Sequence, residues 1–308
     1  MPYLQRPAGL ADAPAITELL NAVDEIEIGR RETDLATVEA DLRHPEVDLE
    51  RDSWLAFDGE RLVAYGLLWD DSGNERIDVD HYVLPEHQRA GARILDALQI
   101  RALARARGNG AAKAVVHLHL NTRPTLDTSL LEERGWYVVR RYHVLQRPLD
   151  RAEDHAPEPP LGVRIRPCTA EADRRRAHLL YQSTFAEHFD FQPRAYDQWL
   201  HDIDAERLDW SLVWLVGTEE WGDAGFLIAR DDREAMGWIR SLGVLREARG
   251  RGLGGLLLRQ AFAAFATRGR DTVGLGVDTA NATGAPELYG RNGLSLHYAV
   301  DTWEAVLT

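Results

Sequence analysis

The chain contains the same pattern twice. An apolar strand, a loop and a helix run through residues 82–108, and the same order returns in residues 243–269. The two stretches align on paired positions, namely Val83 with Val244 and Gly91 with Gly252 at an offset of 161, and then Gly135 with Gly293 at an offset of 158. The two copies are 158 to 161 residues apart, which is long enough for one complete domain. The chain is therefore expected to form two similar domains.

Between the repeats lies the segment DRAEDHAPEPPLG, residues 150–162. Its prolines and charges cannot build a hydrophobic core, so it is predicted to be a linker. We therefore expect one domain at residues 1–149 and a second at residues 163–308.

Composition and charge argue against several classes of binding partner for this chain. Hydrophobic residues make up 44% of it, but no apolar run approaches the ~20 residues that a bilayer span needs. The N-terminus lacks a basic segment followed by an apolar one, and the single cysteine, Cys168, excludes an internal disulfide. A net charge of −14 argues against nucleic acid and is compatible with a cationic substrate. We expect a cytoplasmic protein that acts on a small molecule, with neither nucleic acid nor membrane as partner.

The second half of the chain alternates between strand and helix patterns. Strands are predicted at residues 163–167, 211–216, 225–229, 237–245 and 272–277, with a final pair from Leu294 onward. Helices are predicted at residues 254–267 and 286–291, with two more between residues 170 and 203. Strands come first and then alternate with helices, so each half is predicted to be α/β, with a mixed central sheet flanked by helices.

A glycine-rich loop is the strongest chemical signal. Residues 245–260 read LREARGRGLGGLLLRQ, in which Arg246, Arg249 and Arg251 precede a leucine-rich run. Glycine lets the backbone approach a ligand closely and adopt positive φ. A helix N-terminus presents unpaired N–H groups and the positive end of the helix dipole. The pattern therefore predicts a phosphate site.

Two familiar phosphate motifs fit this loop less well. The lysine and the serine or threonine of a P-loop are absent. Gly250, Gly252 and Gly255 satisfy the dinucleotide pattern G-x-G-x-x-G, and Asp278 ends the next strand. However, residues 245–249 separate the strand from the first glycine, whereas the dinucleotide turn follows its strand directly. About thirty residues follow Asp278, too few to complete a doubly wound sheet.

The loop resembles another family better. The run Arg249-Gly250-Arg251-Gly252-Leu253-Gly254 is similar to the acyl-CoA signature R/Q-x-x-G-x-G/A of the GNAT superfamily of N-acetyltransferases. Residues 242–245 and 256–257 resemble the strand and helix of that family, and residues 281–294 resemble its N…LY…GF segment. The resemblance covers most of residues 163–308. Two domains in one chain are similar to the tandem members, such as the mycothiol synthases.

The resemblance implies acetyl-CoA as cosubstrate. The backbone of residues 249–254 would cradle its diphosphate, the backbone of Leu242 and Val244 would pair with the pantetheine arm, and Tyr289 would protonate the departing thiolate. The expected CoA-binding residues are Leu242, Val244, Arg249, Gly250, Arg251, Gly252, Leu253, Gly254, Gly255, Asn281 and Tyr289. The segment from Asn281 to Leu288 is one residue longer than the spacing usual in the family.

The first half lacks several of these residues. It keeps Gln88, Arg89 and Gly91, but Arg93 stands opposite Gly254, Leu131 opposite Tyr289 and Arg123 opposite Asn281. We expect a degenerate first domain, in which the side chain of Arg93 crowds the approach of a diphosphate.

Transfer to an amine also requires that the amine lose a proton. The family often supplies a strand glutamate six positions before the residue matched to Val244, and here that position is Trp238. Glu234 is the first candidate base, and the others are Glu187, His188, Asp190, His297 and Asp301. Catalysis without a base residue stays open.

The resemblance thus implies an acetyl-CoA-dependent N-acetyltransferase. Its second domain would transfer acetyl to the primary amine of a small cationic metabolite by direct attack. His117 and His119 share a strand face without an evident third ligand, so no metal is expected. A mycothiol synthase and a non-catalytic acyl-CoA sensor are the alternatives. The missing strand glutamate counts against the first, and the presence of Tyr289 counts against the second.

Overall fold

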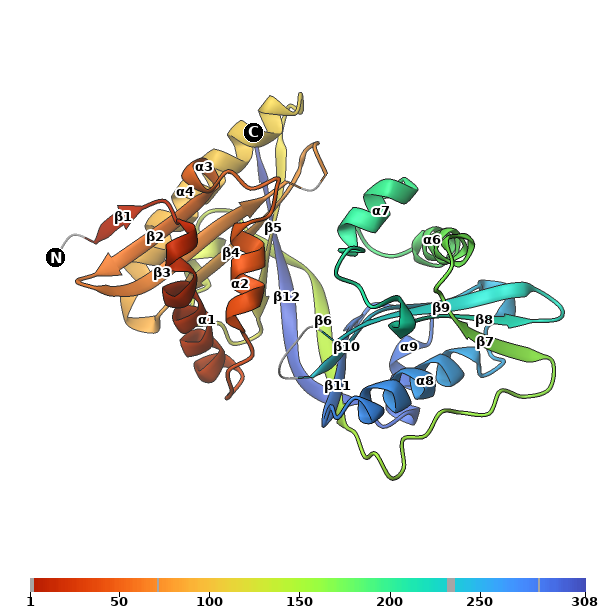
Figure 1. Ribbon diagram of the computed structural model, residues 1–308. Coiled ribbons are helices and arrows are strands. Elements are labelled where there is room, and N and C mark those ends of the chain that lie inside the picture. Colours follow the sequence, from red (N-terminus) through yellow and green to blue (C-terminus); the bar gives the residue numbers. More distant parts are fainter. Residues whose placement is uncertain (1–2, 71, 232–235, 282) are drawn as a thin grey trace. The chain divides into compact units, whose positions relative to one another are not determined.

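The computed structural model describes residues 3–70, 72–231, 236–281 and 283–308 (Figure 1). It divides into two compact units. The first comprises Met1–Tyr142 together with Tyr298–Thr308, and the second comprises His143–His297. The chain therefore returns to its first unit after it has formed the second.

The first unit is a mixed sheet with helices on both faces. Its strands are β1 (Leu4–Arg6), β2 (Ser53–Asp58), β3 (Arg61–Trp69), β4 (Arg76–Val83), β5 (Ala114–Asn121), and parts of β6 (Tyr137–Pro148) and β12 (Ser295–Leu307). Its helices are α1 (Ala13–Glu27), α2 (Leu35–Leu42), α3 (Leu49–Asp52), α4 (Gln88–Gly108) and α5 (Ser129–Glu132), with short 3-10 turns at Leu10–Asp12 and Pro85–His87. The strand order is β1-β2-β3-β4-β5-β12-β6, in which β4 and β5 are parallel.

Strand alternation assigns the two faces of this sheet. A Cβ at Gly66 of β3 would overlap the side chains of Ile94 and Leu98, so that face packs against α4. The neighbouring residue Tyr65 and its β4 partner Tyr82 point to the opposite face, which α1 and α2 cover.

The second unit has the same plan. Its strands are β7 (Val163–Pro167), β8 (Val213–Thr218), β9 (Gly222–Arg230), β10 (Gly237–Val244) and β11 (Thr272–Asp278), with the end of β6 next to β11. Its helices are α6 (Glu171–Phe185), α7 (Tyr196–Asp202), α8 (Leu253–Thr267) and α9 (Ala285–Arg291), with 3-10 turns at Trp210–Leu212 and Arg246–Ala248. Helices α6 and α7 lie on one face of the sheet, and α8 and α9 lie on the other (Figure 1). The α/β fold with mixed sheets is confirmed, as are the helices predicted for this half.

The last strand differs from the prediction both in its length and in the unit to which it belongs. One strand of 13 residues, β12, replaces the predicted final pair, because the sequence SLHYAVDTWEAVL contains neither glycine nor proline to break it. From Val300 to Leu307 this strand pairs antiparallel with β5, and Trp303 and Ala305 are buried in the core of the first unit.

The end of β6, in contrast, lies in the first half of the chain but belongs to the second unit. Leu145 belongs to the core of the second unit, and the Leu149 N–H donates to the Asp271 carbonyl at 2.8 Å. The units therefore do not follow the boundaries 1–149 and 163–308, because each receives a strand segment from the other half of the chain.

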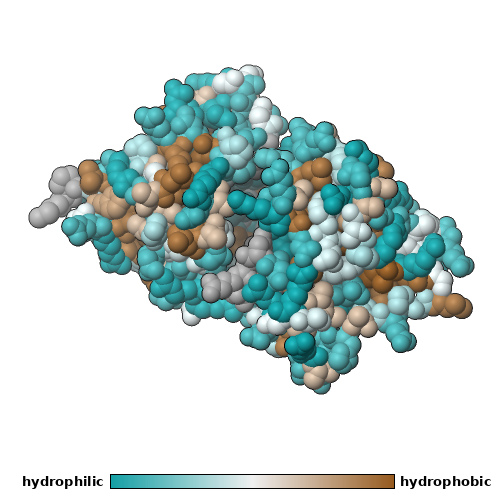
Figure 2. All heavy atoms as spheres, viewed as in Figure 1, coloured by the Kyte–Doolittle hydropathy of each residue, from teal (hydrophilic) through white to brown (hydrophobic). Residues whose placement is uncertain are grey.

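Hydrophilic side chains cover most of the face seen in Figure 2. Among the helices that the structure describes, none is long and apolar enough to cross a membrane.

The pairing of β12 with β5 predicts which unit is destabilised by a mutation in β12. Trp303 is 8% exposed in the core of the first unit, so Trp303→Ala should destabilise that unit by about 3–5 kcal/mol. Hydrogen exchange should accelerate at the amides of β5 and leave those of β11 protected. The matched control is Leu296→Ala in the same strand, where the side chain is 56% exposed and the loss should stay within about 0.5 kcal/mol. Faster exchange at β11 alone would contradict the assignment of Trp303 to the first unit.

Candidate functional site

The glycine-rich loop joins the end of β10 to the start of α8. Gly250 and Gly252 both adopt left-handed conformations, with φ of 74° and 78°. An L side chain rarely takes this conformation, which is why glycine is needed at both positions. A Cβ at either glycine would meet nothing within 4 Å, so this side of the loop is open.

The loop leaves the first amides of α8 available. Gly252 is the N-cap and carries no side chain that could cap the helix, and the first bond of the helix runs from Leu256 N–H to the Gly252 carbonyl. The N–H groups of Leu253, Gly254 and Gly255 precede that bond and lack a partner within the helix. Open amides at the positive end of a helix dipole suit a phosphate or diphosphate.

The parallel strands β10 and β11 separate after a short ladder, before β10 reaches this loop. Within the described residues, β10 and β11 pair in parallel at Gly237, Trp238 and Ile239, and the ladder ends there. β10 continues to Val244 and β11 continues to Asp278. The backbone of β10 beyond Ile239 is therefore left without a β11 partner and could pair with an extended ligand arm.

A bulge in β10 accompanies this parting. Ile239 pairs with Ala229 and Ser241 with Ile228, so Arg240 is an extra residue in the strand. The bulge shifts the alternation, because Gly237 faces Phe265 of α8 whereas Gly243 faces Thr184 of α6. Leu242 and Val244 consequently pack on the α8 side. Nothing in the sequence around Arg240 indicates the bulge.

Tyr289 lies in α9 beside the start of α8. The Cβ position of Gly254 would fall 2.9 Å from Leu288 Cδ2, so the small residue at 254 lets α9 approach closely. Tyr289 is 7% exposed, and burial raises the pKa of its phenol to about 12. No described residue hydrogen-bonds to the hydroxyl. A phenol in this state stays protonated over the physiological pH range and has a proton to donate.

Three other residues predicted to contact CoA interact with groups of the protein itself. The Arg249 Nε–H donates to the Val244 carbonyl at 3.1 Å, and the Arg251 guanidinium lies 4.6 Å above the Trp221 ring. The Asn281 side-chain oxygen accepts a hydrogen bond from the Thr283 N–H at 2.8 Å. Asn281 thus shapes the turn before α9, and its predicted contact with CoA stays a prediction.

The candidate bases lie in different parts of the structure and have different partners. Glu234 lies outside the described residues. Asp301 belongs to the first unit, where Arg141 holds it in a bidentate pair at 2.6 and 2.8 Å. Glu187 is exposed and lies 3.8 Å from Arg246.

His188 comes directly after α6, on the face of the sheet opposite α8, and its ring centroid lies 4.3 Å from that of Phe185. The charges of Asp278, Arg249 and Glu187 act on its pKa. Burial lowers the pKa of His188 below its ordinary value, so the imidazole is neutral at pH 7. The sequence around His188 contains no motif that singles it out from Glu187 or Asp190.

The corresponding place in the first unit has no such loop. Helix α4 already begins at Gln88, so residues aligned with the glycine-rich loop are helical. Gly91, aligned with Gly252, packs inside the helix against Val83, and its carbonyl accepts from His81 at 2.9 Å. The side chain of Arg93 is exposed, whereas a Cβ at the matching position, Gly254, would face Leu288. That Arg93 crowds a diphosphate stays a prediction.

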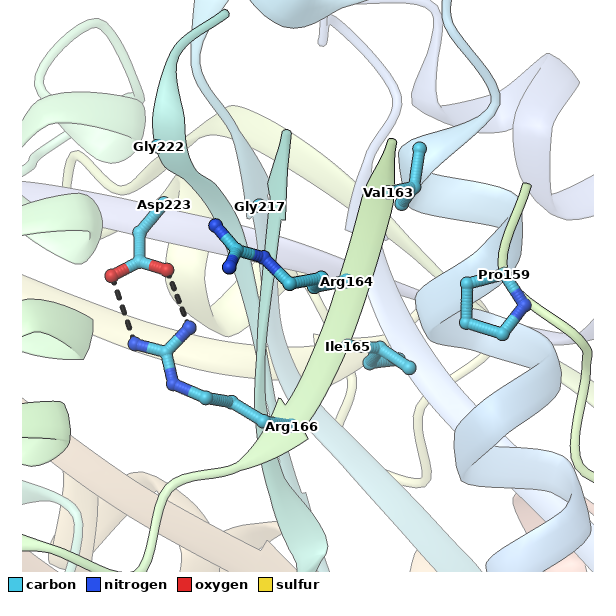
Figure 3. Close-up of a pocket in the computed structure, with 8 residues that line it drawn as sticks. All are labelled: Pro159, Val163, Arg164, Ile165, Arg166, Gly217, Gly222 and Asp223. Atoms are coloured by element: carbon cyan, nitrogen blue, oxygen red, sulfur yellow. Dashed lines mark hydrogen bonds and ion pairs between the residues drawn. The ribbon is translucent and has the colours of Figure 1, made fainter. Parts of the chain in front are cut away.

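Three other features carry no competing chemistry. Cys168 is buried, and burial raises the pKa of its thiol to about 12, so it is no nucleophile. His117 pairs with Glu304 at 2.8 Å, and no described group of three possible ligands could hold a metal. A cavity of about 640 Å³ lies along β7 and the β8–β9 hairpin, where Arg166 neutralises Asp223 (Figure 3). None of the site residues predicted from the sequence lines it.

Comparisons with known proteins agree with this geometry. Residues 178–294 match the model of the Acetyltransferase (GNAT) family. A GCN5-related N-acetyltransferase from Sphaerobacter thermophilus is 26% identical, with a TM-score of 0.85 over 99% of this chain and 95% of that one. No curated protein matches the chain by sequence.

Two more distant structures share the fold. A tandem GNAT protein from the clavulanic acid biosynthesis pathway is 16% identical, with a TM-score of 0.72 over 99% of this chain and 98% of that one. The Saccharomyces cerevisiae N-myristoyltransferase with bound myristoyl-CoA is 10% identical, with a TM-score of 0.61 over 99% of this chain and 80% of that one. The fold therefore corresponds to two GNAT units in tandem.

Proposed function

We propose that this chain, a tandem GNAT acyltransferase, transfers the acetyl group of acetyl-CoA to the primary amine of a small cationic molecule in its second unit. The observation that carries the proposal is the loop at Gly250 and Gly252, which leaves the first amides of α8 open beside strands that part. The family uses acyl-CoA cosubstrates, and the open amides suit the diphosphate of such a molecule.

The remaining contacts follow from the shape of β10. Its backbone from Leu242 to Val244 has no β11 partner and would pair with the pantetheine arm as a strand would. The diphosphate would take the N–H groups of Leu253, Gly254 and Gly255. Arg249 and Arg251 add positive charge around the loop.

Tyr289 is proposed to donate to the departing sulfur. The amine nitrogen attacks the thioester carbonyl carbon, the C–S bond breaks, and negative charge collects on sulfur. A pKa of about 12 keeps the phenol protonated until then. Because that pKa lies above that of a thiol, the phenol begins as a hydrogen-bond donor and the proton follows as charge develops.

His188 is proposed to take the proton that the amine loses. It is neutral at pH 7 and the charges of Asp278 and Arg249 act on it, whereas Asp301 is paired with Arg141 in the first unit. The net charge of −14 supports a cationic acceptor over nucleic acid or an anionic membrane surface. No role is assigned to a metal.

The loop assignment predicts the effect of a charge at its cap. Gly252→Asp places a carboxylate over the amides that would hold the diphosphate, so the Kd for acetyl-CoA should rise about tenfold or more. Gly269→Asp is the matched control, because Gly269 follows the other end of α8 with φ of 81° and equally open space. Calorimetric titration should find one acetyl-CoA per wild-type chain. Two sites would contradict the degenerate first unit, and an unchanged Kd in the Gly252 variant would contradict the loop assignment.

The role of Tyr289 predicts a change in turnover without a change in binding. Tyr289→Phe keeps the ring in the core, so the fold and the Kd for acetyl-CoA should stay close to wild type. Thiol release in the presence of a panel of small primary amines should slow by about 10²-fold. Turnover equal to wild type would exclude Tyr289 as the donor.

The role of His188 predicts a pH dependence. Its pKa is lowered from about 6.5, so turnover should fall only as the pH drops below that value and the imidazole takes up a proton. His188→Gln should lower turnover at pH 7 and remove this acidic limb. Glu187→Gln, at the exposed neighbouring position, should leave both unchanged. An acidic limb that persists in His188→Gln would assign the base to another group.

A further inference from the structure

Arg147, near the end of β6, has a hydrogen-bond partner for every nitrogen of its side chain. Its Nε–H donates to the Pro148 carbonyl at 3.0 Å, and Nη2 donates to both carboxylate oxygens of Asp154 at 2.9 and 3.1 Å. Nη1 donates to the Asn292 carbonyl at 3.4 Å. The guanidinium carbon lies over the Phe262 ring of α8, 4.7 Å from its centroid. Because the guanidinium is planar and its donors point in fixed directions, these contacts hold it in one orientation.

Asp154, in the segment 150–162, keeps Arg147 in this position. Its side chain is 10% exposed, and its Oδ2 also accepts a hydrogen bond from the Asp150 N–H at 2.9 Å. A carboxylate with so little exposure needs an opposite charge beside it, and Arg147 supplies that charge. The sequence predicts a linker here, but the first residues of this segment also anchor an arginine of the second unit.

The Asn292 carbonyl that Arg147 reaches lies directly after α9. Gly293 then takes the left-handed conformation with φ of 82°, and the Leu294 N–H donates to the Tyr289 carbonyl at 3.1 Å. This is a Schellman ending, in which the backbone after a helix takes up its last carbonyls. A positive charge at this end is also favoured by the helix dipole. The backbone of Tyr289 is therefore part of the helix end that Arg147 contacts.

The same arginine also contacts α8, which lies on the same face of the sheet as α9 (Figure 1). Phe262, under the guanidinium, is fully buried in the core of the second unit. The side chain of Asn292 lies beside the first turn of α8, because a Cβ at Gly255 would fall 3.7 Å from its Nδ2. That Nδ2–H donates to the Leu288 carbonyl at 2.8 Å. Arg147 thus fixes the end of α9 relative to the helix whose first amides are open.

We propose that Arg147 is a positioning residue for Tyr289, because it ties the end of α9 to α8 and so keeps the phenol where it would donate to the departing sulfur. The inference rests on the proposed function, in which Tyr289 is the donor. Burial alone raises the pKa of the Tyr289 phenol, so Arg147 is expected to determine where the phenol lies and not how acidic it is. Arg147 precedes residues 178–294, which match the family model, so that match does not point to it.

The first test is a double-mutant cycle on the full chain, with thiol release from acetyl-CoA measured in the presence of the amine panel. Arg147→Gln should lower turnover about tenfold or more, because a displaced phenol no longer meets the sulfur. The Kd for acetyl-CoA should stay close to wild type, because the loop at Gly252 is unchanged. In a Tyr289→Phe background the same substitution should lower turnover no further, because no donor remains to be positioned. Arg147→Lys should restore part of the turnover, because it keeps the charge but not the fork.

Arg268 is the matched control for the loss of an ion pair. It follows α8 and pairs with Asp209 at 2.6 Å, and its side chain is 33% exposed against 23% for Arg147. Arg268→Gln should leave turnover close to wild type. An equal fall in turnover from Arg147→Gln and Arg268→Gln, or an equal fall from Arg147→Gln with and without the Tyr289 hydroxyl, would overturn the proposal.

Hydrogen exchange tests the position of α9 without any acceptor. The amides of Asn292 and Leu294 bond to carbonyls of α9, so Arg147→Gln should make them exchange about tenfold faster while the amides of β11 keep their protection. Unchanged exchange at these two amides, with turnover still low in Tyr289→Phe, would reject Arg147 and leave the donor in place. Turnover equal to wild type in Tyr289→Phe would instead reject the donor, and with it any role of Arg147 in positioning that donor.

Discussion

The short parallel ladder between β10 and β11 is the constraint on which the candidate site depends. Three residue pairs hold the strands together, and the bulge at Arg240 then shifts the facing of β10 before the glycine-rich loop begins. One consequence is an unpaired stretch of backbone, and another is that Leu242 and Val244 pack toward α8. The roles proposed for the loop and for Tyr289 both require this opening beside them.

The two units differ in where one helix begins. In the second unit, left-handed glycines delay the helix until Leu253, and the amides of its first turn stay open. In the first unit, the aligned segment carries one glycine and good helix formers, so α4 starts at Gln88 and the loop disappears into the helix. A change of a few residues in helix propensity therefore separates an open glycine-rich loop from a structural helix end, while the rest of the sheet is retained.

Much of this could be predicted from the sequence, and the exceptions have physical reasons. Strand β7 and the helices of the second half follow from periodicity, and Gly135 and Gly293 both adopt the left-handed turn that their alignment implies. The partner of β12 could not be predicted, because alternation sets which face of a strand is buried but not which sheet receives it. The bulge at Arg240 has no glycine or proline to mark it. His188 gains its place from tertiary packing alone, and its assigned role stays a prediction.

The late return of the chain to its first unit also affects how the protein can be made. On the ribosome, residues 1–142 emerge before the second unit, yet the strand that pairs with β5 is synthesised only after residues 143–297. Until then β5 presents an open edge of backbone donors and acceptors, the kind of edge that pairs with other chains. The first unit can therefore be completed only after the second has been synthesised, and a ribosome that stalls before Val300 releases a chain with an unprotected sheet.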